Sequence, residues 1–175
     1  RGGDFVTQKI ARAVAEYEAN PCATLLLGNL NAKRDWGNAQ DYIRGMWMIL
    51  RHNVADDFVL ATGMDHRVRD LATRAFAQIG VRLSWQGKDI HELGIDTNTG
   101  RIAVRVDPAL FRPLDVHHLR GDATKAQTVL GWRPTTSFDD MIHDMVHAAR
   151  TRRQSKEQPQ DTPNEPSEAK WAMAG

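Results

Sequence analysis

The chain has 175 residues, 41% of them hydrophobic and 26% charged, a balance typical of one globular domain with a real core. No stretch approaches the roughly 20 consecutive apolar residues that a membrane-spanning helix needs, so no association with a membrane is expected. The 23 Lys and Arg nearly balance the 22 Asp and Glu and form no basic patch or recognition module, which argues against nucleic-acid binding.

The only cysteine, Cys22, can form no internal disulfide and no metal site by itself, which favours a reducing, cytoplasmic setting. No base lies near it in the sequence, so Cys22 is expected to be a buried core thiol rather than a nucleophile. The sequence starts at Arg1 and lacks the charged, apolar and small-residue regions of a signal peptide. This indicates the middle of a longer chain, with a processed N-terminus as the alternative.

In chain order, the first predicted element is a helix over residues 5–17, where apolar residues recur at helical spacing. Lys9 lies off this apolar stripe and is expected on the solvated face. The short apolar run 23–27 is ended by turn residues and predicts a buried strand. From residue 41 to residue 50, apolar residues recur every three to four positions, which predicts an amphipathic helix.

The loop between this strand and this helix is the most informative part of the sequence. It reads Gly-Asn-Leu-Asn-Ala-Lys-Arg-Asp-Trp-Gly from residue 28 and places two cations, Lys33 and Arg34, next to each other. Loops carry binding groups, and the planar guanidinium of arginine suits phosphate. A phosphate site is therefore one interpretation. The other is a solvated Lys-Arg pair in which Arg34 bridges to Asp35 or Asp41.

Strands and helices continue to alternate in the next part of the chain. Residues 57–63 predict a strand that ends in a turn, and apolar spacing over residues 68–79 predicts a helix, with Asp65 as its expected cap. Residues 81–85 predict a further strand. This alternation is typical of an α/β fold.

A polar stretch over residues 86–97 separates that strand from another over residues 102–106, where apolar and polar residues alternate. A short helix over residues 123–130 and an amphipathic helix that starts after Ser137 complete the predicted elements. From residue 151 to residue 175 apolar residues are scarce, which predicts a disordered polar tail.

The last helix contains His143 and His147, whose spacing matches that of a zinc-binding helix. Asp144 stands where such helices carry glutamate, and no third ligand motif follows. A solvated helix face explains both histidines, and no metal is expected.

The loop from residue 28, followed by Asp41 and Tyr42, resembles the signature of GDP-mannose 4,6-dehydratases, which belong to the extended short-chain dehydrogenase/reductase family. Two further segments resemble the same dehydratases: Arg-Gly-x-x-Phe-Val-Thr-x-Lys from residue 1 and Phe-Arg-Pro-x-Asp from residue 111. A third, Gly-Asp-x-Thr-Lys-Ala from residue 121, resembles a feature shared by many extended short-chain enzymes. The match runs in order over residues 1–150. It implies the C-terminal part of an extended short-chain dehydrogenase fold, made of the last Rossmann elements and a small mixed α/β substrate-binding lobe.

The resemblance also assigns roles to individual residues. It implies that Arg1 contacts NADP, that Lys9 reaches the GDP diphosphate and that Val6 lines the guanine pocket. It implies that Arg112 binds the diphosphate and joins Arg34 and Lys9 as a third cation there. Where the family usually has another arginine, this chain has Gln8.

One further residue, Asp115, stands where the family has a glutamate that holds the ribose hydroxyls. Aspartate is one methylene shorter, so its contact with the ribose is expected to run through water.

The activity that the resemblance implies is dehydration of GDP-mannose. NADP oxidises the hexose at C4, water is eliminated across C5 and C6, and the hydride returns to C6. This chain has no glycine-rich cofactor loop, and its two tyrosines, Tyr17 and Tyr42, are not followed four residues later by lysine. Residues 1–150 therefore represent the substrate-binding portion, which is expected to be inactive alone and to form a homo-oligomer at full length. The alternatives are another sugar-nucleotide epimerase, dehydratase or decarboxylase of this fold, and a non-catalytic nucleotide-sugar binding module.

Overall fold

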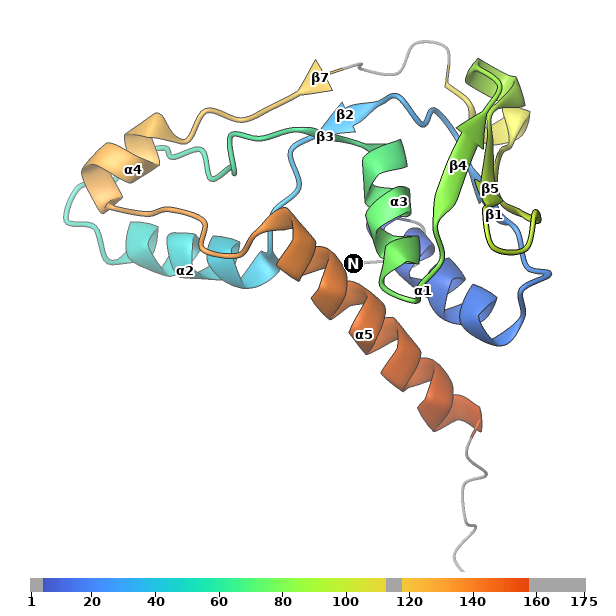
Figure 1. Ribbon diagram of the computed structural model, residues 1–175. Coiled ribbons are helices and arrows are strands. Elements are labelled where there is room, and N and C mark those ends of the chain that lie inside the picture. The colour runs from blue at the N-terminus through green and yellow to red at the C-terminus, as the bar shows by residue number, and fades with distance from the viewer. Residues whose placement is uncertain (1–4, 113–117, 158–175) are drawn as a thin grey trace, which may run out of the picture.

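The computed structural model describes residues 5–112 and 118–157, and its architecture is α/β, as expected (Figure 1). The α-helices are α1 (Val6–Ala19), α2 (Ala39–Leu50), α3 (Val68–Ala77), α4 (Thr124–Leu130) and α5 (Phe138–Glu157). The strands are β1 (Leu25–Leu27), β2 (Lys33–Arg34), β3 (His66–Arg67), β4 (Leu83–Gln86), β5 (Leu93–Asp96), β6 (Ile102–Val106) and β7 (His118–Leu119). Two short 3-10 turns are η1 (Asp89–His91) and η2 (Pro108–Leu110). Of the helices described, none is both long and apolar enough to cross a bilayer.

The strands form two sheets of different size. The larger sheet has the order β1-β6-β5-β4, in which β1 and β6 are parallel and the other pairs are antiparallel. The smaller sheet has the order β3-β2-β7, and β2 is parallel to β7 and antiparallel to β3. Parallel neighbours need a long crossover connection. Residues that are far apart in the sequence therefore meet at the ends of these strands.

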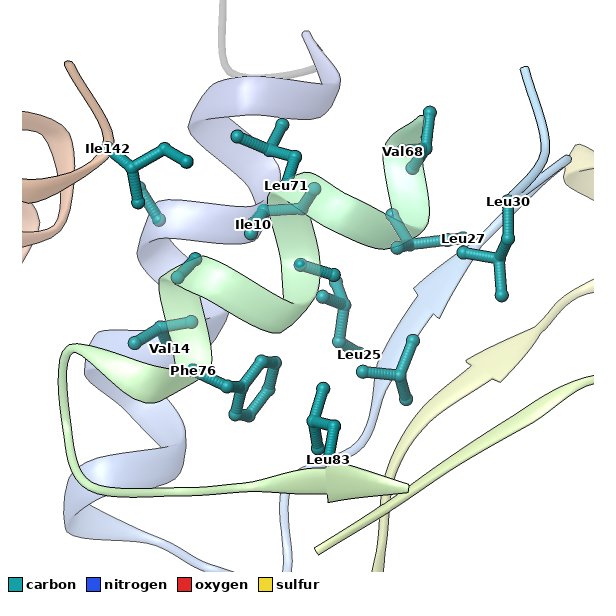
Figure 2. Packing of buried hydrophobic residues seen from close by; sticks show 14 of the residues in the cluster. Ile10, Val14, Leu25, Leu27, Leu30, Val68, Leu71, Phe76, Leu83 and Ile142 are labelled. Carbon is teal, nitrogen blue, oxygen red and sulfur yellow. The ribbon is translucent and has the colours of Figure 1, made fainter. Parts of the chain in front are cut away.

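The main hydrophobic core lies between three helices and the larger sheet (Figure 2). Ile10 of α1, Leu71 and Phe76 of α3, and Ile142 of α5 are all buried and point into it, and Leu25 closes it from β1. These helices bury the faces that their apolar spacing predicted, because a stripe at helical spacing is stable only against another apolar surface.

A second, smaller hydrophobic cluster joins α2 to α4 and to the extended residues 57–61. Trp132 is buried in it, and its indole N–H donates a 2.8 Å hydrogen bond to the backbone carbonyl of Asp41. At Gly45 the helix α2 comes close to Leu60, since a Cβ on this glycine would lie 2.6 Å from the Leu60 side chain. The helices α2 and α4 thus form a unit to one side of α1 and α3 (Figure 1).

Two expectations about the middle of the chain are wrong. Residues 57–63 form no strand, because no strand in the described ranges pairs with them and apolar alternation cannot by itself supply the backbone partners. The helix α3 is also not capped by Asp65. Its first turn is closed by Asp70, whose carboxylate accepts a 3.1 Å hydrogen bond from the backbone N–H of Arg67. Asp65 instead lies 2.5 Å from the imidazole of His118 on β7.

The polar stretch 86–97, for which the sequence indicated no element, contains the strand β5 between β4 and β6. One of its polar residues, Asp96, is buried and accepts hydrogen bonds from the hydroxyls of Tyr17 (3.1 Å) and Thr99 (2.8 Å). Burial raises the pKa of Asp96, but these hydrogen bonds and those from the backbone outweigh it and hold the pKa below its ordinary value. Asp96 thus stabilises the turn between β5 and β6 by accepting hydrogen bonds from residues of that turn.

Two further expectations need correction. Cys22 is exposed, not a core thiol, because it lies in the connection between α1 and β1, where the guanidinium of Arg101 donates to its sulfur at 2.9 Å. The helix α5 continues through Glu157, so residues 151–157 are helical and do not belong to a tail. Residues 158–175 lie outside the described part of the chain.

Asp41 is a buried carboxylate in the first turn of α2 that ties this helix to the loop before α5. It accepts hydrogen bonds from the backbone N–H groups of Thr135 (3.1 Å) and Thr136 (3.0 Å) and from the Thr135 hydroxyl (2.7 Å). Burial raises the pKa of Asp41, but these hydrogen bonds outweigh it and leave the pKa below its ordinary value.

We expect Asp41→Ala to lower the free energy of unfolding by about 1–3 kcal/mol at neutral pH, because the donors of Thr135 and Thr136 lose a charged acceptor. Because the folded pKa is depressed, this stabilisation is present above the unfolded pKa of about 4 and is lost as the pH falls through the folded value. Urea unfolding at neutral pH and at about pH 3 should show the gap between wild type and variant shrink in acid. Asp57→Ala, at an exposed carboxylate, is the control. An equal loss in both variants would contradict the expectation.

Candidate functional site

A cavity of about 280 Å³ lies beside the carboxyl ends of β1 and β6. Its walls come from the start of α1, the loop after β1, the strand β2, the start of α3 and the turn η2 that follows β6. Carboxyl ends of strands are where α/β proteins usually bind ligands, because the loops that leave the sheet there surround a crevice. The lining residues are Val6, Lys9, Leu27, Gly28, Asn29, Ala32, Arg34, Val68, Leu110 and Arg112.

The parallel pairing of β1 with β6 is what assembles this cavity. Leu27 and Val106 are in register at the ends of the two strands, and the backbone N–H of Asp107 donates a 2.8 Å hydrogen bond to the carbonyl of Leu27. The chain after each strand therefore leaves the sheet at the same edge. Gly28 sits where the two segments cross, and a Cβ on it would lie 2.3 Å from the carbonyl oxygen of Leu110. Only glycine permits this approach.

Positive charge dominates the polar lining. Lys9 and Arg34 are half-buried, and Arg112 is exposed at the rim. Among the lining residues that the structure describes there is no Asp or Glu, and none with the hydroxyl, thiol or imidazole of a nucleophile or general base. Converging cations suit an anion with several oxygens, such as a phosphate or diphosphate. The arrangement can bind and orient such a group, whereas bond-making chemistry needs other residues.

The strand β2 fixes the position of Arg34. Its backbone is held on one side by His66 of β3 and on the other by Leu119 of β7. Its guanidinium also donates a 2.7 Å hydrogen bond to the carbonyl of Lys33. Where the sequence suggested a loop, the two cations thus form a short strand between two others. This pairing restricts the directions in which the Arg34 side chain can leave the sheet.

Asp35, the residue after Arg34, connects neighbouring segments by hydrogen bonds. The carboxylate of Asp35 accepts hydrogen bonds from the backbone N–H groups of Thr62 (3.0 Å), Gly63 (2.9 Å) and Gly121 (3.3 Å), and from the Thr62 hydroxyl (2.5 Å). A single side chain thereby holds together three segments that are distant in the sequence. Asp35 is engaged in this junction, and Asp41 in its contacts with Thr135 and Thr136. The interpretation of Arg34 as a cation bridged to either carboxylate receives no support from these contacts.

Trp36 and Gly37 have packing roles in the same motif. The indole of Trp36 stacks on Phe138, with the ring centroids 6.1 Å apart and the planes 10° from parallel. Gly37 gives room to Tyr42, because a Cβ there would lie 2.3 Å from the tyrosine hydroxyl oxygen. Of the four consecutive residues Arg-Asp-Trp-Gly, only the arginine lines the cavity.

The start of α3 supports the loop on the other side of the cavity. The backbone N–H groups of Val68 and Arg69 donate to the carbonyls of Ala32 (3.1 Å) and Leu30 (3.0 Å), and the Arg69 guanidinium donates to the Asn31 side chain (3.2 Å). Arg69 also forms an ion pair with Glu92, whose side chain is only 2% exposed. Burial raises the pKa of Glu92, and the neighbouring guanidinium opposes that rise. This buried pair joins the loop over residues 28–32 to the larger sheet.

Comparison with known proteins identifies the family. The sequence matches the family model described as GDP-mannose 4,6 dehydratase over residues 1–145, which is most of the chain. The chain belongs to this dehydratase family. The GDP-mannose 4,6-dehydratase of Sinorhizobium fredii is 49% identical over 146 residues, and the human GDP-mannose 4,6 dehydratase is 45% identical over 148 residues. These alignments cover 83% and 85% of this chain but 42% and 40% of the two relatives. The chain thus spans about two-fifths of the length of the dehydratases that it matches.

Solved structures support the expected fold. RMD from Pseudomonas aeruginosa, in a structure complexed with NADPH, superposes with a TM-score of 0.70 at 17% sequence identity. The superposition covers 87% of this chain and 44% of that protein. The α/β arrangement expected for part of an extended short-chain dehydrogenase is therefore confirmed.

For this dehydratase-family chain, four of the six residues assigned from the sequence line the same cavity: Val6, Lys9, Arg34 and Arg112. They come from three separate parts of the chain. The other two, Arg1 and Asp115, lie outside the described residues. Lys9 was placed on the solvated face by its helical spacing alone, and the structure shows it half-buried at the cavity instead.

Several other groups line the cavity without having been indicated by the sequence. Asn29, Val68 and Leu110 contribute to its walls, and Gly28 gives the necessary room. The turn residues that end β1 were the available signal for Gly28 and Asn29. Val68 and Leu110 gave no such signal, because apolar residues also occur at any core position. The histidines of α5 are exposed at 143 and 147, and no group of three potential metal ligands occurs in the described ranges.

Proposed function

We propose that this chain is the substrate-binding part of a GDP-mannose 4,6-dehydratase and that its cavity holds the diphosphate of GDP-mannose. Lys9, Arg34 and Arg112 neutralise the diphosphate, and Val6 provides apolar contact for the guanine. Asp115 binds the ribose hydroxyls in this proposal. Family membership and the names of relatives that are 45–49% identical support the choice of substrate.

The observation that carries the proposal is the meeting of the three cations at one cavity. They arise at the start of α1, on β2 and after η2, and nothing in their sequence spacing requires them to converge. A diphosphate distributes its negative charge over several oxygens, and guanidinium groups bind such oxygens with paired, charge-assisted hydrogen bonds. The cavity volume of about 280 Å³ lies near the lower end for small-molecule sites, so it fits the diphosphate and an adjoining ring better than a whole nucleotide sugar.

The proposed activity also requires a nicotinamide cofactor, which supplies hydride transfer at the hexose C4 and C6 when bound. The structural relative from Pseudomonas aeruginosa was solved with NADPH, which favours NADP. Of this chain, only Arg1 was assigned to the cofactor, and no glycine-rich loop occurs in the sequence. The described residues therefore bind and orient the nucleotide sugar. Holding the cofactor, and moving protons during water elimination, falls to polypeptide outside this chain.

Calorimetric titration of the chain with GDP, GMP and UDP tests the proposal. GDP should bind at least about tenfold more tightly than GMP, because its second phosphate adds charge-assisted hydrogen bonds, each contributing about 1.5–3 kcal/mol. UDP should bind more weakly than GDP, since it lacks the purine that Val6 contacts. Equal affinities for GDP and GMP would show that the cavity does not bind the diphosphate. In a longer polypeptide that contains this chain, mass spectrometry should show GDP-mannose losing one water, and an unchanged substrate would refute the assigned reaction.

A further inference from the structure

A second cavity, of about 600 Å³, lies between α1 and the last turns of α5, and we call it the α1–α5 groove. It is separate from the proposed diphosphate site, because the two cavities share no lining residue. Ala15 of α1 and Ala149 of α5 supply apolar lining, and charged side chains surround them. Its volume is that of a site for a small ligand or a short peptide.

Positive charge is concentrated in the α1–α5 groove. Its described lining residues include four cations and one carboxylate, namely Arg12, Arg152, Arg153, Lys156 and Glu16. The carboxylate is already engaged, because Glu16 accepts a 3.1 Å hydrogen bond from the guanidinium of Arg153. The other three cations are exposed, and no carboxylate in the described part of the chain pairs with any of them. The groove therefore presents three positive charges that the described residues leave uncompensated.

The last turns of α5 lie beyond the apolar contacts that hold the rest of this helix (Figure 1). Contacts with the main core end at Ala149, whereas the helix continues to Glu157. An ion pair of 2.6 Å between Arg150 and Glu18 helps to keep these turns beside α1. Residues 150–156 contain three arginines and one lysine, which repel one another at helical spacing. An anionic ligand in the groove would relieve this repulsion.

The segment that follows α5 carries the complementary charge. Residues 158–175 contain three carboxylates, Asp161, Glu165 and Glu168, against one lysine. Trp171 follows shortly after, and an indole suits both apolar lining and the faces of guanidinium groups. An extended chain spans up to about 3.5 Å per residue, whereas the part of α5 that lines the groove is only about 12 Å long. The segment is long enough to turn back at the end of α5 and run along the groove.

We propose that the α1–α5 groove is a docking site for residues 158–175 of the same chain. Their carboxylates pair with the uncompensated cations through charge-assisted hydrogen bonds, and the indole of Trp171 packs on the apolar lining. The segment is attached to the helix that forms one wall, so its effective concentration at the groove is high and modest contacts suffice. Its scarcity of apolar residues predicted disorder, but charge complementarity and one aromatic side chain supply contacts that need no core of their own. The docking uses no residue of the diphosphate cavity and does not depend on the substrate.

Zero-length carbodiimide cross-linking of the full chain tests the proposal, because this reagent joins a carboxylate to an amine only where the two are in contact. Arg12→Lys places an amine in the groove, and Gln154→Lys places one on an exposed position of α5 outside it. Gln154 is only three residues from the end of α5, so an undocked segment would reach it at least as easily as position 12. Peptide mass spectrometry should find Glu165 or Glu168 linked to position 12 at least about fivefold more often than to position 154, because docking concentrates these carboxylates in the groove.

Equal linkage to the two positions would overturn the proposal. So would links between peptides of different molecules, detected in a mixture of ¹⁴N- and ¹⁵N-labelled protein, because the occupant of the groove would then be a second copy of this chain.

Charge removal in the groove gives an independent measurement. Arg152→Gln, made in the Arg12→Lys protein, should lower the linkage to position 12 about three- to tenfold, because one of the paired cations is lost. Arg105→Gln, at an exposed arginine of β6 outside the groove, should change it by less than about twofold at physiological salt. The indole N–H signal of Trp171 in NMR spectra should shift with the first substitution and not with the second. Unchanged linkage in Arg152→Gln, or an equal fall in both variants, would contradict docking in the groove.

Discussion

Arg34→Ala and Arg112→Ala should each weaken the binding of GDP-mannose by about 1.5–3 kcal/mol, or roughly 10- to 150-fold, in calorimetric titrations. Each guanidinium lines the proposed diphosphate site, and its removal takes away charge-assisted hydrogen bonds. The loss should fall on GDP and GDP-mannose and leave the much weaker binding of guanosine unchanged, because guanosine has no phosphate. The double variant should lose less than the sum of the two single losses, since both side chains act on the same diphosphate.

The control for these variants is Arg105→Ala. Arg105 is an exposed arginine on β6 that does not line the cavity, so its removal changes net charge by the same amount. It should alter affinity by less than about twofold at physiological salt, where distant surface charges are screened. If all three variants lost affinity equally, the effect would be one of net charge. If neither Arg34→Ala nor Arg112→Ala lost any, the diphosphate would bind elsewhere.

Arg69→Met should lower the free energy of unfolding by about 3–5 kcal/mol at mildly alkaline pH, the cost of leaving a buried charge without its partner. The substitution keeps most of the side-chain volume and removes the guanidinium that faces Glu92. Urea unfolding measured by circular dichroism gives the difference from the wild type. The loop over residues 28–32 should also loosen, because Arg69 holds Asn31.

The pH dependence of this variant distinguishes lost charge from lost packing. Burial already raises the pKa of Glu92, and removing Arg69 takes away the group that opposes the rise. A carboxyl with a raised folded pKa is most compatible with folding below its unfolded pKa, and the penalty appears as the pH rises through the folded value. The deficit of Arg69→Met should therefore shrink as the pH is lowered, and Arg69→Met combined with Glu92→Gln should recover part of it at high pH.

A surface arginine provides the comparison. Arg74 pairs with Asp139, and both side chains are substantially exposed, at 44% and 63%. Arg74→Met should cost less than about 1 kcal/mol, because exposed ion pairs contribute little. A deficit of the same size in both arginine variants, or one independent of pH, would show that Glu92 does not depend on Arg69 for its charge.

The sequence by itself determined the fold class and the family, and it pointed to four residues that line one cavity in the structure, Val6, Lys9, Arg34 and Arg112. Helical spacing identified the faces that α1, α3 and α5 bury, because burial of an apolar stripe is a local requirement of each helix. The loop from residue 28 and the segment around Arg112 carried the resemblance, since their residue types are chemically specific. Where local pattern was ambiguous, prediction failed: β5 was hidden by its polar neighbours, and residues 57–63 had the alternation of a strand without a partner.

Only the tertiary structure decided which distant residues and segments come into contact. Arg34 and Arg112 are far apart in the sequence, and they meet because β1 and β6 pair in parallel and release their loops at one edge. Asp35 looked like a possible partner for Arg34, yet its contacts are with Thr62, Gly63 and Gly121. The apolar stripe of α2 likewise faces outward although its spacing is that of a core helix. Contacts between distant segments depend on strand pairing and on which surfaces remain to be covered, and neither is encoded in the spacing of residues along one element.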